Sequence, residues 1–177
     1  MYKLPKFLCP NLKTELIRLG KSNDGGYSLS EKSLKEVKII FSFGLDDDWS
    51  FEADLKKVTE AKIICFDNSV NNNFWIKRFL KDIVNFNFKS NIFKQFQRLF
   101  TFFKYKRFFM QKNIYHIKKH LISRDIIFPN QIEKDFTNLK NILADWGSDS
   151  FLIKMDIEGN EYRVLDDIIK NQENMIG

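Results

Sequence analysis

Three carboxylates lie within six residues of one another, directly after an apolar run. Asp156, Glu158 and Glu161 follow the run 151–155, in which Lys154 alone is charged. The spacing beyond them predicts a helix, so the segment predicts a buried strand, a tight acidic turn and a helix. Ligands of open α/β sheets bind beyond the carboxyl ends of the strands. A carboxylate there can hold a hydroxyl group and accept its proton, which makes Asp156 the first catalytic candidate. Glu158 is either a second catalytic carboxylate or a residue that stabilises the helix start, whereas Glu161 is better placed for the structural role.

Two further residues follow predicted strands. Gly44 comes directly after the β-rich run 37–43, and Asp67 comes after the apolar run 61–66. A glycine at a strand end lets a nucleotide-like ligand approach the backbone closely, and an acid about 20 residues later can bind ribose hydroxyls. The alternatives are a plain turn glycine for Gly44 and, for Asp67, a turn cap formed with the two residues after it.

Several of these residues belong to segments that resemble a known family. The segment KMDIEGNE over 154–161 resembles the K-x-D-x-E-G-x-E signature of FkbM-type methyltransferases, which use S-adenosylmethionine. DGGY over 24–27, FSFGLD over 41–46 and SFE over 50–52 resemble further segments in one branch of that family. The resemblance covers most of the chain from residue 18 to residue 168 and is weakest in the middle.

The resemblance implies a fold, a cofactor and a reaction. The implied fold is the Rossmann-like class I methyltransferase fold, a three-layer α/β sandwich around a parallel sheet. The implied cofactor is S-adenosylmethionine, and the implied reaction is O-methylation of a hydroxyl on a sugar, a glycan or another small-molecule acceptor. The chain ends sooner than family members do, so the C-terminal strands are expected to be missing.

The resemblance also assigns roles to individual residues. It gives the cofactor site five residues: Asp24, Gly44, Glu52, Asp67 and Asp156. From the residues alone, Asp24 indicates a polar turn and Glu52 a first-turn helix position. The resemblance places Tyr27 near the cofactor as well. No metal site is expected, because His116 and His120 lie among lysines and no third ligand is evident.

The pattern of apolar residues predicts alternating strands and helices, and hence a parallel sheet with right-handed crossovers. Ser50 is expected to cap a helix. The predicted helices cover 11–19, 31–36, 51–58, 73–84, 91–109, 131–146 and 160–171, and the predicted strands cover 37–43, 61–66, 113–122 and 151–155.

Length and composition favour one domain in a reducing compartment. The chain has 177 residues, a hydrophobic fraction of 44% and two cysteines, Cys9 and Cys65, which argues against a disulfide framework. Neither a signal peptide nor a membrane span is evident, so a soluble cytoplasmic protein is expected. The domain is expected to divide into an N-terminal cap (1–36), a cofactor half (37–70), a basic aromatic insert (74–124) and a catalytic strand and helix (125–177).

Charge is distributed unevenly along the chain. Residues 74–124 contain thirteen Lys or Arg and a single acid, whereas the whole chain has a net charge of +6. The plainest interpretation is a packed Phe face with a solvated basic face. An electropositive surface for an anionic ligand or a membrane comes second. Nucleic-acid binding comes third, because no nucleic-acid motif supports it.

The early end of the chain leaves alternatives open. The strand that carries Asp156 would lie at an exposed sheet edge, which invites pairing with a partner chain. The alternatives to an active methyltransferase are a truncated, non-catalytic cofactor-binding remnant and a basic module that binds nucleic acid or a membrane surface.

Overall fold

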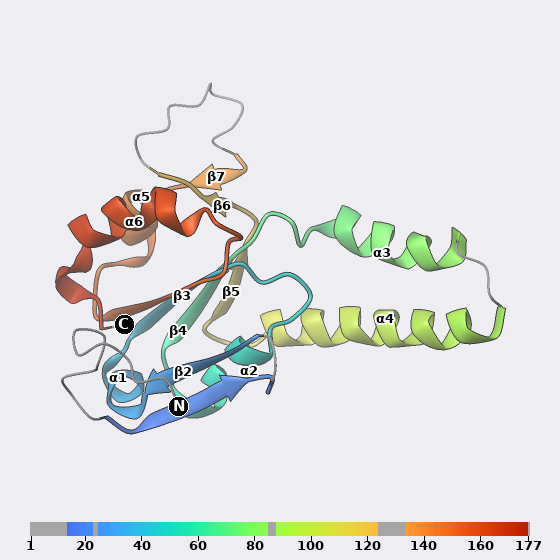
Figure 1. Ribbon diagram of the computed structural model, residues 1–177, viewed down its shortest axis with the longest axis horizontal. Coiled ribbons are helices and arrows are strands. Elements are labelled where there is room, and N and C mark those ends of the chain that lie inside the picture. Colours follow the sequence, from blue (N-terminus) through green and yellow to red (C-terminus); the bar gives the residue numbers. More distant parts are fainter. Residues whose placement is uncertain (1–13, 23–24, 85–87, 124–133, 177) are drawn as a thin grey trace, which may run out of the picture.

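The computed structural model describes residues 14–22, 25–84, 88–123 and 134–176 (Figure 1). A parallel sheet lies at its centre, with strand order β5-β4-β3-β8. Its strands are β3 (Ile39–Phe43), β4 (Lys62–Phe66), β5 (Ile114–Ile117) and β8 (Phe151–Met155). The expected α/β architecture with a parallel sheet is therefore confirmed.

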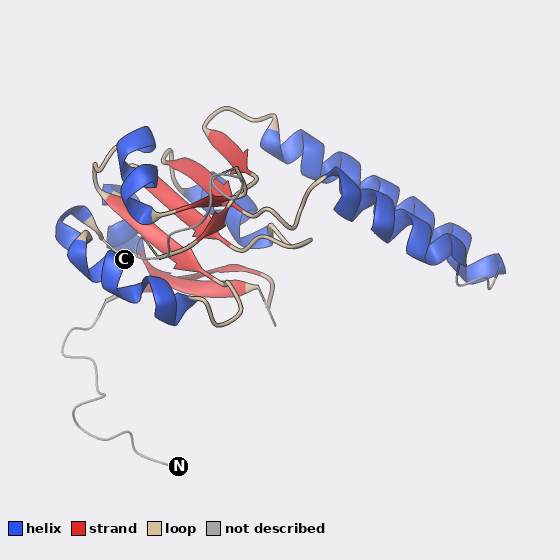
Figure 2. Ribbon diagram, turned by 90° about the horizontal axis from the view of Figure 1, so that it is seen from above, coloured by secondary structure: helices blue, strands red, loops and turns tan. Residues whose placement is uncertain are grey.

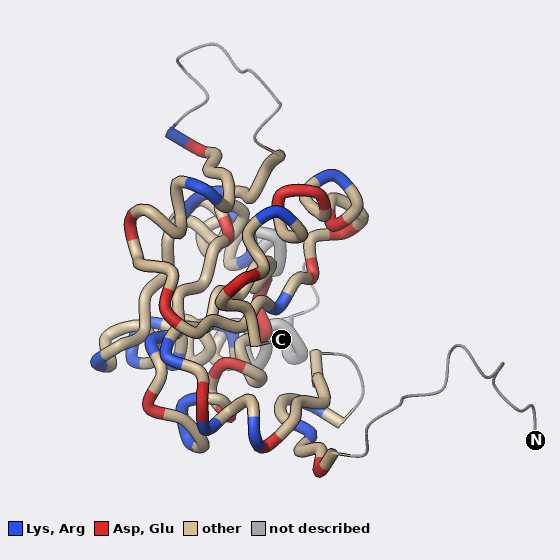
Figure 3. The backbone as a smooth tube through the Cα atoms, turned by 90° about the vertical axis from the view of Figure 1, so that its left-hand side faces the viewer, with Lys and Arg blue, Asp and Glu red and all other residues tan. Residues whose placement is uncertain are grey.

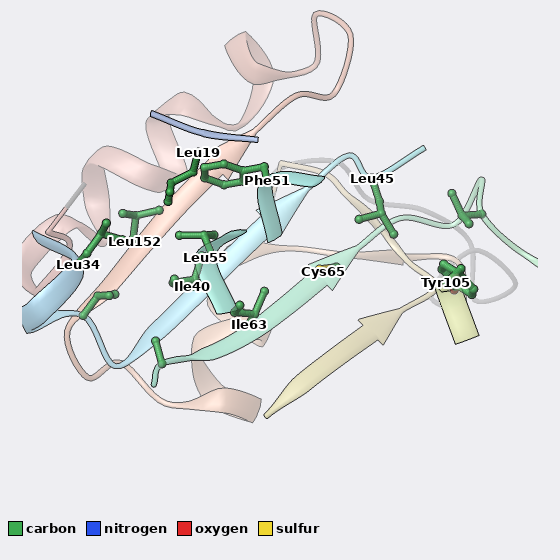
Figure 4. Packing of buried hydrophobic residues seen from close by; sticks show 13 residues of the cluster. Leu19, Leu34, Ile40, Leu45, Phe51, Leu55, Ile63, Cys65, Tyr105 and Leu152 are labelled. Carbon is green, nitrogen blue, oxygen red and sulfur yellow. The ribbon is translucent and has the colours of Figure 1, made fainter. Parts of the chain in front are cut away.

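Alternation along the buried strands divides the core into two layers. In β3, Ile40 faces one side of the sheet, while Ile39, Phe41 and Phe43 face the other. The first side packs against α2 (Ser50–Val58), where Leu55 is fully buried (Figure 4). Both faces of the sheet are covered, which explains why its strands are almost continuously apolar.

Helices and a hairpin form the outer layers (Figure 1). On the α2 side lie α1 (Glu31–Glu36) and the antiparallel strands β1 (Leu16–Gly20) and β2 (Gly26–Ser30). On the other side lie α5 (Leu139–Trp146) and α6 (Glu161–Lys170). A short parallel pair, β6 (His120–Leu121) with β7 (Phe136–Thr137), lies next to the sheet. A 3-10 turn, η2 (Gln172–Asn174), follows α6.

The basic segment 74–124 divides into two parts. Helices α3 (Asn72–Val84) and α4 (Phe88–Phe109) run alongside each other and project from the body as an arm (Figures 1 and 2). The residues after α4 return to the body and form β5 and β6. Acidic residues are spread over the elements of the body (Figure 3). The projecting part is thus the helical pair, and β5 is a strand of the central sheet.

Three expected elements differ from the structure. The helix expected over 11–19 is wrong over its described part, because Leu16–Gly20 is a strand. Its alternate residues Ile17 and Leu19 pack against the core. The helix expected over 131–146 begins only at Leu139, because the Asn138 side chain caps it and accepts from the Asn141 amide at 3.0 Å. Its start at 131–133 lies outside the described residues. The strand expected over 113–122 is interrupted between β5 and β6.

The helix start at Ser50 and the edge of β8 also differ from expectation. Ser50 is the first helical residue and not the cap, and its amide donates to Asp48 Oδ1 at 3.1 Å. Beyond α6, Met175 forms a parallel bridge with Phe151, and the Ile176 amide donates to the Phe151 carbonyl at 2.8 Å. Residues 175 and 176 therefore begin to pair with the edge of β8 that was expected to be exposed.

The aromatic packing on the α5–α6 side generates a stability prediction. Phe41 is fully buried and its ring lies 5.8 Å from that of Phe151. We expect Phe41→Ala to lower the free energy of unfolding by about 3–5 kcal/mol, because it removes buried surface and leaves a cavity. Urea denaturation measures the change. Tyr162→Ala on exposed α6 surface is the control and should change stability by about 0.5 kcal/mol or less; equal losses in both variants would contradict the assigned core.

Candidate functional site

A cavity of about 1100 Å³ lies at the carboxyl ends of β3, β4 and β8. The chain passes from β3 outward to β4 and β5, and then returns to the opposite side of β3 to form β8. The cavity therefore lies at the point where strand order reverses, which is where open α/β sheets bind ligands. Five expected site residues line it: Gly44, Glu52, Asp67, Asp156 and Glu158. Asp24 lies outside the described residues, but its neighbour Gly25 lines the cavity.

Sheet register places two polar side chains beneath the cavity. Ser42 of β3 and Lys154 of β8 are direct partners in the parallel ladder, and their side chains share the α2 side of the sheet. Glu52 of α2 lies above them: Ser42 Oγ donates to Glu52 Oε1 at 2.5 Å. Lys154 Nζ donates to the Gly44 carbonyl and carries its charge near Glu52. All three side chains are buried, so together they form a polar island in an apolar layer.

One atom of this island has no partner. Glu52 is 1% exposed, and its Oε2 atom makes no hydrogen bond within the described part of the chain. Burial raises the pKa of Glu52 above its ordinary value, against the opposing effect of the Lys154 charge. Leaving a buried polar atom unsatisfied is costly, and such atoms in native structures call for an explanation. Because Glu52 forms part of the cavity wall, a ligand that donates a hydrogen bond there would satisfy this oxygen.

Asp67 is already saturated by its own chain. Its Oδ2 atom accepts from the amides of Leu45 and Asp46 at 2.9 and 3.0 Å. Its Oδ1 atom accepts from the amide and the hydroxyl of Ser69 at 2.7 and 2.6 Å. Burial alone would raise the pKa of Asp67, but these hydrogen bonds outweigh it and lower the pKa. The geometry therefore favours the turn-organising alternative, because a ribose hydroxyl would have to displace an existing bond.

Asp156 meets the hairpin of the N-terminal region. The Tyr27 hydroxyl donates to Asp156 Oδ2 at 2.7 Å. The Tyr27 ring packs against Phe51 at 4.9 Å between centroids, and Lys154 Nζ lies 5.3 Å from the same ring. Asp156 itself is exposed at the cavity surface. The structure thus brings Tyr27 of the DGGY segment to Asp156 of the KMDIEGNE segment, although the two residues are more than a hundred positions apart in the sequence.

Gly44 has a structural role that does not depend on a ligand. Its φ is +81°, and a Cβ atom would lie 1.8 Å from the Asp156 carbonyl oxygen. The glycine is required because the backbone of β8 approaches closely, whether or not a ligand also does. The Asp156 amide donates to the Phe43 carbonyl at 2.9 Å, which fixes the two strand ends together.

The acidic turn after β8 contains backbone strain. Glu158 has φ +53°, a left-handed conformation that non-glycine residues rarely adopt. Asp46, on the facing loop, has φ +44°. Both residues line the cavity, and strain of this kind concentrates at functional sites. Glu161 has the structural role favoured for it: its Oε1 atom accepts from the Ile157 amide at 2.7 Å, at the start of α6.

His116 and Tyr105 support the site from behind, and sequence reasoning assigned neither this role. His116 Nε2 lies 2.9 Å from the Asp67 carbonyl, which can only accept, so Nε2 carries the proton and Nδ1 accepts from the Tyr105 hydroxyl. Burial lowers the pKa of His116 and raises the pKa of Tyr105 to about 12. His120 lines the cavity. The described residues contain no group of three or more His, Cys, Asp or Glu arranged to hold a metal ion.

Sequence reasoning also missed Ser42 and the buried position of Lys154. The signal was present: each is the one polar residue in an otherwise apolar strand, at equivalent positions of FSF and IKM. Seven carboxylates and three Lys or Arg line the cavity, so it favours a ligand that carries positive charge and donates hydrogen bonds. The chain matches none of the protein-family models, curated proteins or solved structures with which it was compared.

The Gly44 contact predicts unequal costs for two glycine substitutions. Gly44 and Gly159 both have positive φ, but a Cβ at Gly159 meets nothing within 4 Å. We expect Gly159→Ala to cost about 1–2 kcal/mol from φ strain, and Gly44→Ala to cost distinctly more, because its Cβ would also collide with the Asp156 carbonyl. Thermal or urea unfolding measures both. Equal losses of stability in the two variants would show that the close contact between Gly44 and the Asp156 carbonyl does not constrain the residue at position 44.

The buried imidazole predicts a pH dependence. Because the pKa of His116 is lowered on folding, the unfolded chain takes up the proton first, and the stability that the neutral imidazole provides is lost as pH falls below about 6.5. We expect His116→Gln, which keeps a donor for the Asp67 carbonyl, to destabilise the protein more at pH 7.5 than at pH 5.5. Urea denaturation of both proteins at the two pH values tests this. If His116→Gln lowers the free energy of unfolding by the same amount at both pH values, the imidazole is not held neutral in the folded protein.

Proposed function

We propose that the chain is an S-adenosylmethionine-dependent methyltransferase that acts on a hydroxyl group of a sugar, a glycan or another small molecule. The observation that carries this proposal is the unpartnered, buried Oε2 atom of Glu52 in the wall of the cavity. It lies where the strand order reverses, which is where nucleotide-type cofactors bind in Rossmann-like sheets. Strand order, with β3 between β4 and β8, agrees with the class I methyltransferase fold that the sequence resemblance implies.

The residues of the cavity fit the proposed cofactor. S-Adenosylmethionine has a sulfonium, an ammonium and two ribose hydroxyls, all of which favour nearby carboxylates. Glu52 has an acceptor oxygen to offer, and Asp156 and Glu158 add negative charge on the β8 side. Asp67 fits less directly, since its oxygens hold the 45–46 loop. We therefore assign ribose or ammonium recognition to Glu52 and the shaping of the loop to Asp67.

The cavity has room for more than a cofactor. Small-molecule and cofactor pockets commonly have about 300–1000 Å³, so a cavity of about 1100 Å³ can hold a cofactor beside an acceptor. This size supports a two-substrate reaction. It does not by itself select the acceptor.

Asp156 is the residue best placed to handle the acceptor hydroxyl. Its carboxylate lies at the cavity surface, and the Tyr27 hydroxyl fixes the Oδ2 atom. Held in this way, the carboxylate can orient a hydroxyl and accept its proton as the oxygen attacks. When bound, S-adenosylmethionine supplies a methyl group that is already strongly electrophilic, so the chain chiefly has to position the acceptor and remove a proton. Glu158, in its strained turn, adds a second carboxylate beside it.

Calorimetric titration with S-adenosylmethionine tests the proposal. We expect the wild-type chain to bind, and Glu52→Gln to weaken binding by about tenfold or more, because it replaces one carboxyl oxygen of a buried site with an amide nitrogen that cannot accept a hydrogen bond. Glu60→Gln is the matched control, since Glu60 is 98% exposed and lies outside the cavity lining; its affinity should equal that of the wild type. Circular dichroism confirms that each variant is folded.

Two outcomes would count against the proposal. If a folded wild-type chain does not bind S-adenosylmethionine, the methyltransferase assignment fails. If Glu52→Gln binds as tightly as the wild type, the unpartnered oxygen does not mark the cofactor site. Binding without methyl transfer to any hydroxyl acceptor would instead favour a non-catalytic cofactor-binding remnant.

A further inference from the structure

The helical arm formed by α3 and α4 exposes apolar side chains on both helices. On α4, Phe96, Leu99, Phe100 and Phe103 are exposed, with 68% of Phe96 and 61% of Phe100 accessible to solvent. Their spacing of three and four residues places them on one face of the helix. On α3, the range 76–80 contains Ile76, Phe79 and Leu80, which are also exposed. Exposed apolar patches of this kind mark interaction sites.

These faces are not the packing faces of the arm. The two helices contact each other through other residues: the Trp75 ring lies 5.5 Å from Phe102 and 5.2 Å from Tyr105. The Arg98 guanidinium donates to the Arg78 carbonyl across the helix pair. The Phe residues at helical spacing are Phe93, Phe96, Phe100 and Phe103. The interpretation of this spacing as a packed core face is wrong for Phe96, Phe100 and Phe103, which are exposed, and the side chain of Phe93 lies outside the described part of the chain.

Positive charge accompanies the exposed apolar faces. The segment 72–109 contains nine Lys or Arg and the single acid Asp82. Lys104, Lys106 and Arg107 are exposed on α4, and Lys104 Nζ lies 4.4 Å from the centre of the Phe100 ring. Basic and aromatic side chains are thus interleaved on the same stretch of helix.

We propose that the α3–α4 arm docks onto the surface of a bilayer that contains anionic lipids. Amphipathic helices with Lys and Arg beside Phe and Leu lie in the membrane interface, with the apolar face in the acyl boundary and the cations at the headgroups. Lys side chains suit this arrangement because their stems cover apolar surface while the ammonium reaches the phosphates. Within the described residues, none of the helices combines the length and the apolar character that a membrane crossing requires.

Other occupants of this surface fit less well. A second copy of the chain would bring two strongly basic arms together, and their charges would repel. A nucleic acid could satisfy the cations and stack on the aromatic rings, but Ile76, Leu80 and Leu99 offer no stacking surface. Anionic lipid accommodates both the charge and the aliphatic side chains.

Docking would also act close to the cavity. Arg78 of α3 pairs with Asp47 and lies 3.9 Å from Asp46, and both aspartates line the cavity. The root of the arm therefore lies beside the cavity mouth. The proposal stands on the arm alone and does not require that the cavity bind S-adenosylmethionine.

Vesicle co-sedimentation of the full chain tests the proposal. We expect binding to vesicles of phosphatidylcholine and phosphatidylserine at 70:30, weaker binding as salt rises, and much weaker binding to phosphatidylcholine alone. The triple variant Phe96→Ser, Phe100→Ser, Phe103→Ser should bind at least about tenfold more weakly. The matched control changes three exposed apolar residues of α6, Tyr162→Ser, Leu165→Ser and Ile169→Ser, and should bind as the wild type does.

A second pair of variants tests the charges. Lys104→Glu with Arg107→Glu should weaken binding by about tenfold or more. Lys32→Glu with Lys62→Glu, exposed positions outside the arm, changes the net charge equally and should leave binding within about threefold of the wild type. Circular dichroism shows whether each variant is folded.

The outcomes that overturn the proposal are distinct. Absence of wild-type binding to the anionic vesicles would overturn it, as would equal loss in the arm variants and the controls. Salt-sensitive binding to a single-stranded oligonucleotide without vesicle binding would replace it with a nucleic-acid surface.

Discussion

The close approach of two strand ends is the constraint on which the rest of the site depends. Gly44 and Asp156 lie so near each other that no side chain fits at Gly44. This contact joins the ends of β3 and β8, the first and last strands of the central sheet in chain order, and the loops that follow both strands line the same cavity. Lys154 adds a hydrogen bond to the Gly44 carbonyl, and Asp67 holds the next two amides. The shape of the loop after Gly44, the position of the acidic turn after β8 and the cavity between them thus all depend on the contact between Gly44 and Asp156.

Buried polar groups beneath the cavity carry a cost in stability. Ser42, Glu52 and Lys154 lie within a layer that is otherwise filled by residues such as Ile40 and Leu55. Apolar residues at the same three positions would pack without any need for partners. The hydrogen bonds from Ser42 to Glu52 and from Lys154 to the Gly44 carbonyl satisfy part of this group, but the Glu52 Oε2 atom has no partner within the described residues. A buried atom of this kind, in a residue of the cavity wall, is the observation on which the proposed cofactor site rests.

The sequence was informative where local periodicity decides structure. Apolar runs and acidic strand ends predicted β3, β4 and β8 and the edge at which Asp156 lies, because alternation and strand ends are local properties. Contacts between distant segments were not predictable in the same way. The Tyr27–Asp156 bond, the four bonds to Asp67 and the link from Tyr105 through His116 depend on side-chain directions that only the assembled sheet defines.

The pattern of apolar residues gave a wrong prediction where a turn determines the secondary structure. The run 14–20 has apolar residues at both helical and strand spacing. Gly20 and Gly25, both with positive φ, allow the turn after it, so the run forms the first strand of a hairpin. The Phe spacing in α4 predicted the helix correctly but not its partner, because a helical period says which residues share a face and not what covers that face.

The attachment of the arm makes it a lever. Its 22-residue helix α4 is about 33 Å long at 1.5 Å per residue. Near its root, Arg78 is paired with the loop that carries Asp46 and Asp47, while Tyr105 is bonded through His116 to the strand end at Asp67. The arm is thus attached to two segments that line one cavity, so a rotation of the arm about its root would act on both of them. Both attachments lie near the root, so a displacement of several ångströms at the far end of the arm would correspond to a much smaller displacement at the cavity.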